Sequence, residues 1–395
     1  MHVGLVVPHD IDYGLDLANA LSEIGIYVTL YFSYKRLSLY LPKAQASSTL
    51  TQEEMGKLLF ENRILPEKCR MKLFRYPRIR SPRSFSVVRR IKQTMHEDGI
   101  DVAHILIGPG DLWGAALANL LRDMPVTSTM IIPKPNVRES LPDFVIVAIN
   151  KLLAIGSDII IVNGESQVDL VRRIYRVPDR RIAYVPLGPR TTAVKWSQLK
   201  DTEQPGTVLF FGRAHPHKGL EYLVQAQPII SRQVPQARIV IAAHGEYLEH
   251  CRQMIQDASK FEIHEGFVSG AVLASFFVKA CLVVLPYLSA STSGILMTAY
   301  AFGKPVVATR VGCLPEYVEH GKTGLLVPSA NIEKLAEAIV SLLRDDALRH
   351  QMGEKAKQRV SEEQKRIAIQ TLRIYEKAMS LHKKYRGGTR NVEIN

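Results

Sequence analysis

The chain has 395 residues with a formal net charge of +13 at pH 7, and 46% of its residues are hydrophobic. This length exceeds one hydrophobic core and fits two domains, which excludes a small scaffold stapled by disulfides. Four cysteines lie far apart without paired spacing, which argues against a disulfide framework or a zinc site. No basic leader precedes the first apolar stretch, and the longest apolar segment, 144–155, is too short to span a bilayer, so we expect a cytoplasmic protein.

In the first half, apolar runs alternate with amphipathic segments, a pattern typical of a mainly parallel sheet with helices on both faces. The candidate strands are Val3–Val7, Tyr27–Phe32, Val102–Ile107, Val126–Ile132, Ile159–Val162 and Ile182–Val185. The first of them is followed by a loop, His9–Gly14, and a helix over 15–24. This loop lacks the glycine triplet of a nicotinamide site, which argues against an oxidoreductase.

A run of basic residues without any acid lies between the second and third candidate strands, from Arg70 to Arg90. Its cations are Arg70, Lys72, Arg75, Arg78, Arg80, Arg83, Arg89 and Arg90. Apolar residues such as Phe74, Tyr76 and Phe85 are interleaved with them. The mixture suits an anionic membrane surface, because it combines attraction with insertion. Nucleic acid is a second interpretation, although no nucleic-acid motif accompanies the run, and a solvated loop and helix face is the third.

The second half repeats the alternation after a polar linker without clear periodicity at 191–205. Its candidate strands are Val208–Phe211, Arg238–Ala242, Glu262–Glu265, Leu282–Leu285, Val306–Thr309 and Gly324–Val327. Helices are predicted over 332–343 and 362–382, and the tail beyond them is expected to be loose.

Two loops of this half carry the pattern of a phosphate site. The first follows strand Val208–Phe211 and contains Gly212, Arg213 and Lys218. An arginine fork beside a mobile ammonium suits a diphosphate, although cations on a turn are often merely solvated. In the second loop, Ser293 and Gly294 follow strand Leu282–Leu285 and open an apolar helix. Amide groups at a helix N-terminus attract anions, and the alternative is an ordinary tight turn between strand and helix.

These loops, together with the segments Phe302–Ala308, Val311–Glu316 and Gly321–Val327, resemble glycosyltransferase family 4 over most of residues 206–345. Weaker similarity extends to 157–163 and 182–188. The resemblance implies an α/β fold of the GT-B type, in which two doubly wound Rossmann-like domains face a cleft. It places an acceptor-side domain at 1–190 and a donor-binding domain at 206–365. Residues 366–395 would form a helix that packs back on the first domain and a loose tail.

The same resemblance implies a retaining transferase that needs no cofactor or metal and moves a sugar from a nucleotide donor to a glycan or lipid-linked acceptor. Arg213 and Lys218 would then neutralise the departing diphosphate. The residues implied around the donor are Gly212, Gly266, Phe267, Val268, Ser293, Gly294, Ile295, Thr298 and Glu316, with the base held near 266–268. Tyr13, Gly14 and His104 would lie on the acceptor side.

The chain departs from the family pattern at three places. Two glutamates that commonly contact the donor correspond to Ala290 and Thr298, and a common His-Asp pair corresponds to Ile131-Ile132. Two hypotheses follow. The chain is an active enzyme in which a leaving phosphate oxygen accepts the proton of the acceptor, or it is a catalytically silent relative that serves as a partner subunit or nucleotide-binding regulator.

Overall fold

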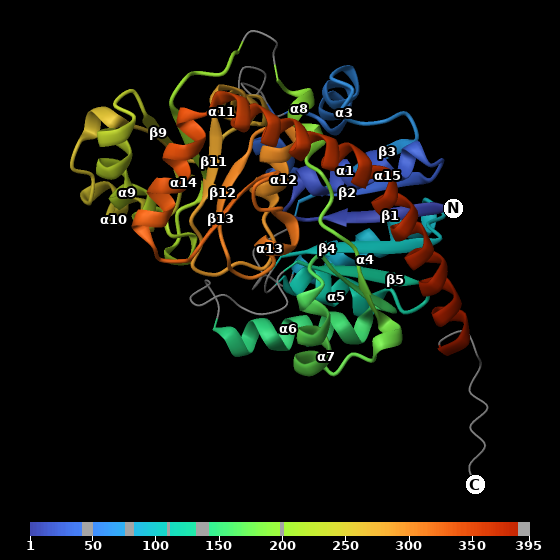
Figure 1. The fold of residues 1–395 in the computed structure, drawn as a ribbon. Helices are drawn as coiled ribbons and strands as arrows, with labels where there is room; N and C mark the ends of the chain where they lie inside the picture. Colours follow the sequence, from blue (N-terminus) through green and yellow to red (C-terminus); the bar gives the residue numbers. More distant parts are fainter. Residues whose placement is uncertain (42–49, 76–82, 109–110, 132–141, 198–200, 386–395) are drawn as a thin grey trace. The chain divides into compact units, whose positions relative to one another are not determined.

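The computed structural model describes residues 1–41, 50–75, 83–108, 111–131, 142–197 and 201–385. They form two compact α/β units (Figure 1). The first unit comprises the described residues of Met1–Ser38, Thr49–Pro186 and Lys365–Asn395, and the second comprises those of Leu39–Ser48 and Leu187–Gln364. Each unit has its own parallel sheet.

The sheet of the first unit has 7 strands in the order β3-β2-β1-β4-β5-β6-β7, all paired in parallel. Its strands are β1 (His2–Val7), β2 (Tyr27–Ser33), β3 (Cys69–Phe74), β4 (Val102–Ile107), β5 (Val126–Met130), β6 (Ile159–Val162) and β7 (Ile182–Tyr184). Six of them were predicted from their apolar runs, because strands buried on both faces read as continuous hydrophobic segments. The predicted strand Val126–Ile132 ends earlier, at Met130, and Ile132 lies outside the described residues.

Helices cover both faces of this sheet, and Figure 1 shows α5, α6 and α7 stacked on one side of it. Along the chain α4 packs on α5, α5 on α6, and α6 on α7. The helices are α1 (Ile11–Glu23), α2 (Tyr34–Tyr40), α3 (Gln52–Glu61), α4 (Arg83–Glu97), α5 (Leu112–Leu120), α6 (Asp143–Gly156) and α7 (Ser166–Tyr175), followed by the 3-10 turn η2 (Asp179–Arg181). No helix in the described part of the chain is long and apolar enough to cross a bilayer.

The basic run contains an unpredicted strand, β3, so treating the whole run as one surface was wrong. Residues Cys69, Met71 and Phe74 of β3 are buried, and β3 pairs in parallel with β2. Arg70 and Lys72 alternate with the buried residues, which gives an edge strand the composition of a solvated segment. Lys72 also pairs with Asp98, at 3.4 Å between Nζ and the carboxylate. Arg78 and Arg80 lie outside the described residues.

The sheet of the second unit has 6 parallel strands in the order β10-β9-β8-β11-β12-β13. All six were predicted, and their bounds differ from the prediction by at most two residues at either end. The strands are β8 (Thr207–Arg213), β9 (Arg238–His244), β10 (Phe261–Glu265), β11 (Leu282–Leu285), β12 (Val306–Thr309) and β13 (Gly324–Val327).

The segment that precedes this sheet contains a short helix, α8 (Thr191–Lys195), where the sequence predicted an irregular linker. Thr192, Ala193 and Trp196 are buried, so packing stabilises a helix that the local hydrophobic periodicity does not predict. The other helical elements are η3 (Pro216–Lys218), α9 (Leu220–Gln233), α10 (Tyr247–Gln253), η4 (Ala258–Lys260), α11 (Gly270–Lys279), α12 (Gly294–Ala301), α13 (Leu314–Tyr317) and α14 (Ile332–Arg344).

The last helix, α15 (Asp346–Tyr385), runs through 40 residues without a break, and its C-terminal part belongs to the first unit. There Ile367, Ile374 and Ala378 pack against residues of β6 in one hydrophobic cluster. The Tyr375 hydroxyl lies 2.7 Å from Nδ1 of His104. The predicted helix at 362–382 is therefore part of a longer one.

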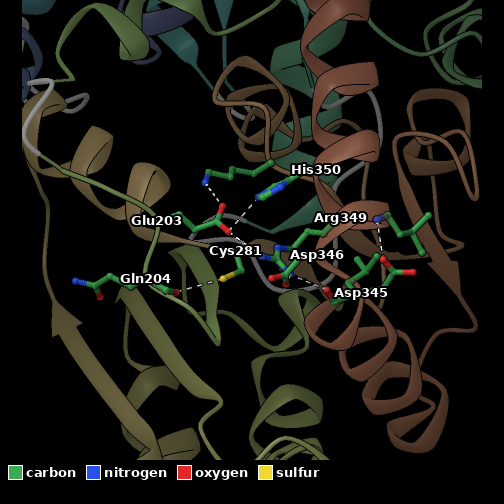
Figure 2. Close-up of polar contacts among 10 residues, drawn as sticks. Glu203, Gln204, Cys281, Asp345, Asp346, Arg349 and His350 are labelled. Carbon is green, nitrogen blue, oxygen red and sulfur yellow. Dashed lines mark hydrogen bonds and ion pairs between the residues drawn. The ribbon is translucent and has the colours of Figure 1, made fainter.

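A polar network on the second unit joins three segments that lie far apart in sequence (Figure 2). The carboxylate of Glu203, just before β8, accepts from Lys304 Nζ at 2.7 Å and from Arg349 Nη2 at 3.0 Å. Lys304 belongs to the Gly-Lys-Pro turn before β12, and Arg349 lies in α15. Since β8 and β12 are parallel, this network lies at the amino-terminal edge of the sheet. The two phosphate loops follow the carboxyl ends of β8 and β11, at the opposite edge of the sheet.

Candidate active site

Both predicted phosphate loops lie at the topological switch point of the second sheet. From β8 the chain continues outward through β9 to β10, and it then returns to β11 on the other side of β8 before continuing to β12 and β13. The loop after β8 and the loop after β11 therefore leave neighbouring strands at the same carboxyl edge. Ligands of open parallel sheets bind at this kind of crevice.

The backbones of the two loops are in direct contact. The carbonyl oxygen of His217 accepts from Leu288 N at 2.8 Å. Gly219 has φ +62°, and a Cβ there would lie 2.0 Å from the carbonyl oxygen of Pro286. A residue other than glycine would push the loops apart, since it would meet both a strained φ and a backbone collision.

Lys218 and Ser293 both lie against the side chain of Tyr287. Lys218 Nζ lies 3.8 Å from the centre of the Tyr287 ring, a cation–π arrangement. The hydroxyl of buried Tyr287 lies 3.4 Å from Ser293 Oγ. Ser293 caps α12 by accepting from Leu296 N at 3.3 Å. The ammonium of the first loop and the helix start of the second are thus brought together around Tyr287.

The N-terminus of α12 presents the amides of Gly294 and Ile295. The first N–H groups of a helix have no preceding carbonyl in the helix to bind, and the helix dipole makes this end attractive to anions. A Cβ on Gly212, where φ is +129°, would lie 3.8 Å from Ile295 Cγ1, so the end of β8 approaches the same helix start.

Arg213 ends β8 with an exposed side chain. Its charge and that of Lys218 affect His217, whose pKa falls to about 4 because burial disfavours its charged form and Lys218, His215 and Arg213 add positive charge around it. Nδ1 of His217 lies 2.6 Å from Nδ1 of His215. A neutral His217 adds no further charge to the loop at pH 7.

Arg190 is a residue of this site that the sequence analysis missed. It precedes α8 and is 4% exposed. A Cβ on Gly294 would lie 3.0 Å from Arg190 Nη2, so its guanidinium lies against the glycine that opens α12. The chain contributes a third cation from a segment about a hundred residues away, and no local motif marks it. Gly294 therefore makes room for Arg190 as well as for an approaching ligand.

The loop implied to hold the base follows β10, two strands from β8 in the same sheet. Gly266 has φ +115° and donates its N–H to the carbonyl oxygen of Ala243 at 3.0 Å. Phe267 is 55% exposed, and its ring centre lies 4.1 Å from that of His244 at the end of β9. Val268 is half-buried.

Two of the three positions where the family pattern fails, Ala290 and Thr298, lie around α12 and α13. The hydroxyl of Thr298 donates to the carbonyl oxygen of Gly294 at 3.0 Å, so it is bonded within its own helix. A Cβ on Gly312 would lie 1.6 Å from the carbonyl oxygen of Ala290, which shows how closely the loop before α13 packs there. Glu316 in α13 is half-buried, and its backbone carbonyl accepts from Arg359 Nη2 at 3.3 Å.

The candidate acceptor-side residues belong to the first unit. The hydroxyl of buried Tyr13 accepts from Asn163 Nδ2 at 3.2 Å. A Cβ on Gly14 would lie 2.5 Å from Val7 Cγ2, so this glycine lets α1 pack closely on β1. Ile131, after β5, is half-buried.

His104 is fully buried, and both of its ring nitrogens have partners. Nε2 lies 2.7 Å from Thr129 Oγ1, and Nδ1 meets the Tyr375 hydroxyl. Burial lowers the pKa of His104 to about 3. This arrangement suits a residue that joins the sheet to α15.

Comparison with known proteins agrees with this geometry. The family described as glycosyl transferases group 1 matches residues 205–345, which include both phosphate loops. A D-inositol 3-phosphate glycosyltransferase of Pseudarthrobacter chlorophenolicus is 30% identical over 291 residues, covering 69% of this chain and 67% of that protein. A GDP-mannose-dependent alpha-(1-6)-phosphatidylinositol monomannoside mannosyltransferase of Mycobacterium tuberculosis is 33% identical over 187 residues, 42% of this chain and 48% of that protein.

The fold agrees as well. The solved structure of sucrose-phosphate synthase from Thermosynechococcus elongatus matches with a TM-score of 0.71 at 19% identity, covering 96% of this chain and 99% of that one. The two doubly wound parallel sheets are those of the GT-B class. Together with the identity to the Pseudarthrobacter enzyme over two thirds of its length, this shows that the chain belongs to the group 1 glycosyltransferases, the family 4 type that its loops resemble.

Proposed function

We propose that this glycosyltransferase moves a sugar from a nucleoside diphosphate donor to a hydroxyl of a glycan or lipid-linked acceptor, with retention at the anomeric carbon and without a metal ion. The observation that carries the proposal is the convergence of Lys218, the Ser293 cap and the N-terminus of α12 at the β8/β11 switch point. Two relatives support the substrate classes, because their names specify GDP-mannose, phosphatidylinositol mannoside and inositol 3-phosphate.

In this proposal the donor diphosphate binds across the two loops. Lys218 and Arg213 neutralise one side of it, and the Gly294 and Ile295 amides bind oxygens on the other. Negative charge grows on the diphosphate as the glycosidic bond breaks, so fixed positive groups stabilise the transition state more than the ground state. The nucleotide base of the donor stacks on Phe267, and Glu316 lies near the donor.

In the single-step route that we propose, the acceptor attacks the face from which the diphosphate departs, which retains the configuration at the anomeric carbon. The bond from the anomeric carbon to the phosphate oxygen breaks, and a bond from that carbon to the acceptor oxygen forms. The acceptor proton passes to the departing phosphate oxygen. This route needs no protein carboxylate as a base, which accommodates Ala290 and Thr298 at the positions of the two family glutamates.

The acceptor is a component of a cell-surface polysaccharide or glycolipid, presented to the enzyme at the cytoplasmic face of an anionic membrane. The unit that would receive it carries the basic run, and the net charge of +13 favours an anionic surface.

The test begins with nucleotide sugars. A panel is screened for protection against thermal unfolding, since a ligand that binds only the folded state raises the unfolding temperature. The best donor is then used in turnover assays with lipid and glycan acceptors, in the presence of a chelator. Arg213→Ala and Lys218→Ala should each weaken nucleoside diphosphate binding and slow transfer. Arg232→Ala, an exposed arginine on α9 of the same unit, is the control and should change neither.

Two results would contradict the proposal. Equal nucleoside diphosphate affinity in wild type, Arg213→Ala and Lys218→Ala would remove the donor from these loops. Binding without turnover across the whole donor and acceptor panel would favour a silent relative that acts as a partner subunit or regulator.

A further inference from the structure

Three consecutive helices of the first unit carry an exposed apolar side chain within their first three residues. Phe85 on α4 is 55% exposed, Leu112 on α5 is 36% exposed, and Phe144 on α6 is 75% exposed. Each helix follows a strand of the parallel sheet, so its N-terminus lies at the carboxyl edge. Because α5 packs on both α4 and α6, the N-termini of the three helices lie along one side of that edge.

Helix α6 extends this apolar surface along its outer face. Phe144, Ala148, Leu152 and Ile155 are all exposed, and their spacing of four, four and three residues places them on one stripe. Leu152 and Ile155 are 46% and 49% exposed. The inner face already buries Ile146, Ile149 and Leu153, so α6 carries apolar side chains on both its inner and its outer face.

Several cations are exposed beside these side chains, together with the acid Asp143 next to Phe144. Arg89 and Arg90 are exposed on α4, and Lys151 is exposed on α6. The guanidinium of Arg89 lies 5.0 Å from the centre of the Phe85 ring, so a cation and an exposed aromatic side chain lie together. From Arg70 to Arg90 the sequence contains no acid.

We propose that this apolar rim, defined as Phe85, Leu112, Phe144, Leu152 and Ile155, docks on the surface of an anionic lipid bilayer. Separate protruding side chains suit insertion past the lipid headgroups to the acyl boundary, where each one finds an apolar environment without a complementary groove. The neighbouring cations then meet anionic headgroups. A second copy of the chain is a poorer occupant, because a symmetric contact would place Arg89 and Arg90 close to their own equivalents.

The inference deepens the proposed function. The role of membrane docking rests on that function, since the docked unit is the one expected to receive a lipid-linked acceptor. The rim also replaces the broader surface expected from the sequence, because Met71 and Phe74 of the basic run are buried in β3. The bilayer contacts are assigned to the starts of α4, α5 and α6 and to the outer stripe of α6.

Co-sedimentation with phosphatidylglycerol vesicles tests the rim. Phe85→Asp and Phe144→Asp should each weaken vesicle binding about tenfold, since a charge replaces a side chain that enters the interface. Phe60→Asp is the matched control, because Phe60 on α3 is 53% exposed and lies outside the rim. It should bind vesicles as wild type does. The double variant Arg89→Glu with Arg90→Glu should bind at least tenfold more weakly and show a reduced salt dependence.

A second measurement does not depend on losing binding. Phe144→Trp should show a blue-shifted emission component on phosphatidylglycerol vesicles, beyond any change in the wild-type tryptophans, and no such component on phosphatidylcholine vesicles. Equal vesicle binding of all the phenylalanine variants, or an unshifted Phe144→Trp, would overturn the inference. So would a dimer in solution that Phe144→Asp dissociates. Thermal protection by nucleotide should persist in every rim variant, so failure of the donor site and failure of docking are distinguishable.

Discussion

Replacing Glu203 with glutamine should destabilise the second unit far more than replacing an exposed glutamate that has an equally short ion pair. Glu203 is 25% exposed in its side chain, while its partners Lys304 and Arg349 are only 10% and 6% exposed. Removing one partner of a buried pair costs about 3–5 kcal/mol, because the remaining charge is left without compensation. Glutamine keeps one acceptor oxygen and the site is partly solvated, so we expect a loss of about 2–3 kcal/mol.

The control is Glu337→Gln on α14. Glu337 also accepts from a lysine, Lys334, at 2.7 Å, but the two side chains are 56% and 57% exposed. Exposed pairs contribute about 0–1 kcal/mol. Urea denaturation, followed by circular dichroism, gives both free energies of unfolding. Similar losses in the two variants would show that burial of Lys304 and Arg349 does not set the cost.

The effect of Glu203→Gln should also depend on pH. Burial alone would raise the pKa of Glu203, but the hydrogen bonds and charges of Lys304 and Arg349 outweigh it and lower the pKa below the usual 4.5. The charged carboxylate therefore contributes its full stability above pH 4.5, and the contribution disappears as the pH falls through the lowered value. The difference between wild type and variant should shrink in acid. A constant difference from neutral pH down to the acid limit would refute the reasoning.

Three further predictions concern the phosphate loops. Gly219→Ala should reduce both the free energy of unfolding and the nucleotide affinity, because its Cβ would lie 2.0 Å from a carbonyl oxygen. The control Gly321→Ala has φ +80° but nothing within 4 Å of its Cβ, so it carries only the backbone strain. Calorimetric melting measures the effect on stability, and calorimetric titration measures the effect on nucleotide affinity. Gly294→Ala should displace Arg190 and weaken nucleoside diphosphate binding about tenfold, as should Arg190→Ala, and unchanged titration isotherms would exclude Arg190 from the site. The imidazole of His217 should titrate by NMR near pH 4, so its contribution to stability is complete above pH 6.5 and is lost as the pH falls toward 4; a normal midpoint would contradict the burial and nearby charges that lower its pKa.

The buried strands could be predicted because their composition matches their environment. Leu282–Leu285 is apolar throughout and is buried throughout, so its pattern has one interpretation. By contrast, Cys69–Phe74 is an edge strand, and the charges of Arg70 and Lys72 made it resemble a surface segment. Local composition does not distinguish an edge strand from a solvated loop when cations alternate with buried side chains.

The site was predictable to the extent that it is local in sequence. Ser293 and Gly294 are adjacent to the helix they open, and Lys218 belongs to the same loop as Arg213. Arg190 acts across about a hundred residues, so only the tertiary structure reveals its contact with Gly294. His104 is the opposite case. The sequence suggested an ionisable group on the acceptor side, whereas in the structure both ring nitrogens have buried partners.

The helix α15 has a consequence for the order in which the protein is made. The described residues of the second unit are nearly contiguous in sequence from Leu187 to Gln364, but the first unit includes residues after Lys365. Until the ribosome has synthesised that segment, His104 lacks Tyr375 and Asp158 lacks His382, its partner at 3.2 Å. The N-terminal segment is translated first, but the core of the first unit is completed only when the C-terminal part of α15 has been synthesised. The second unit is free to fold earlier, which reverses the usual order of domain folding during synthesis.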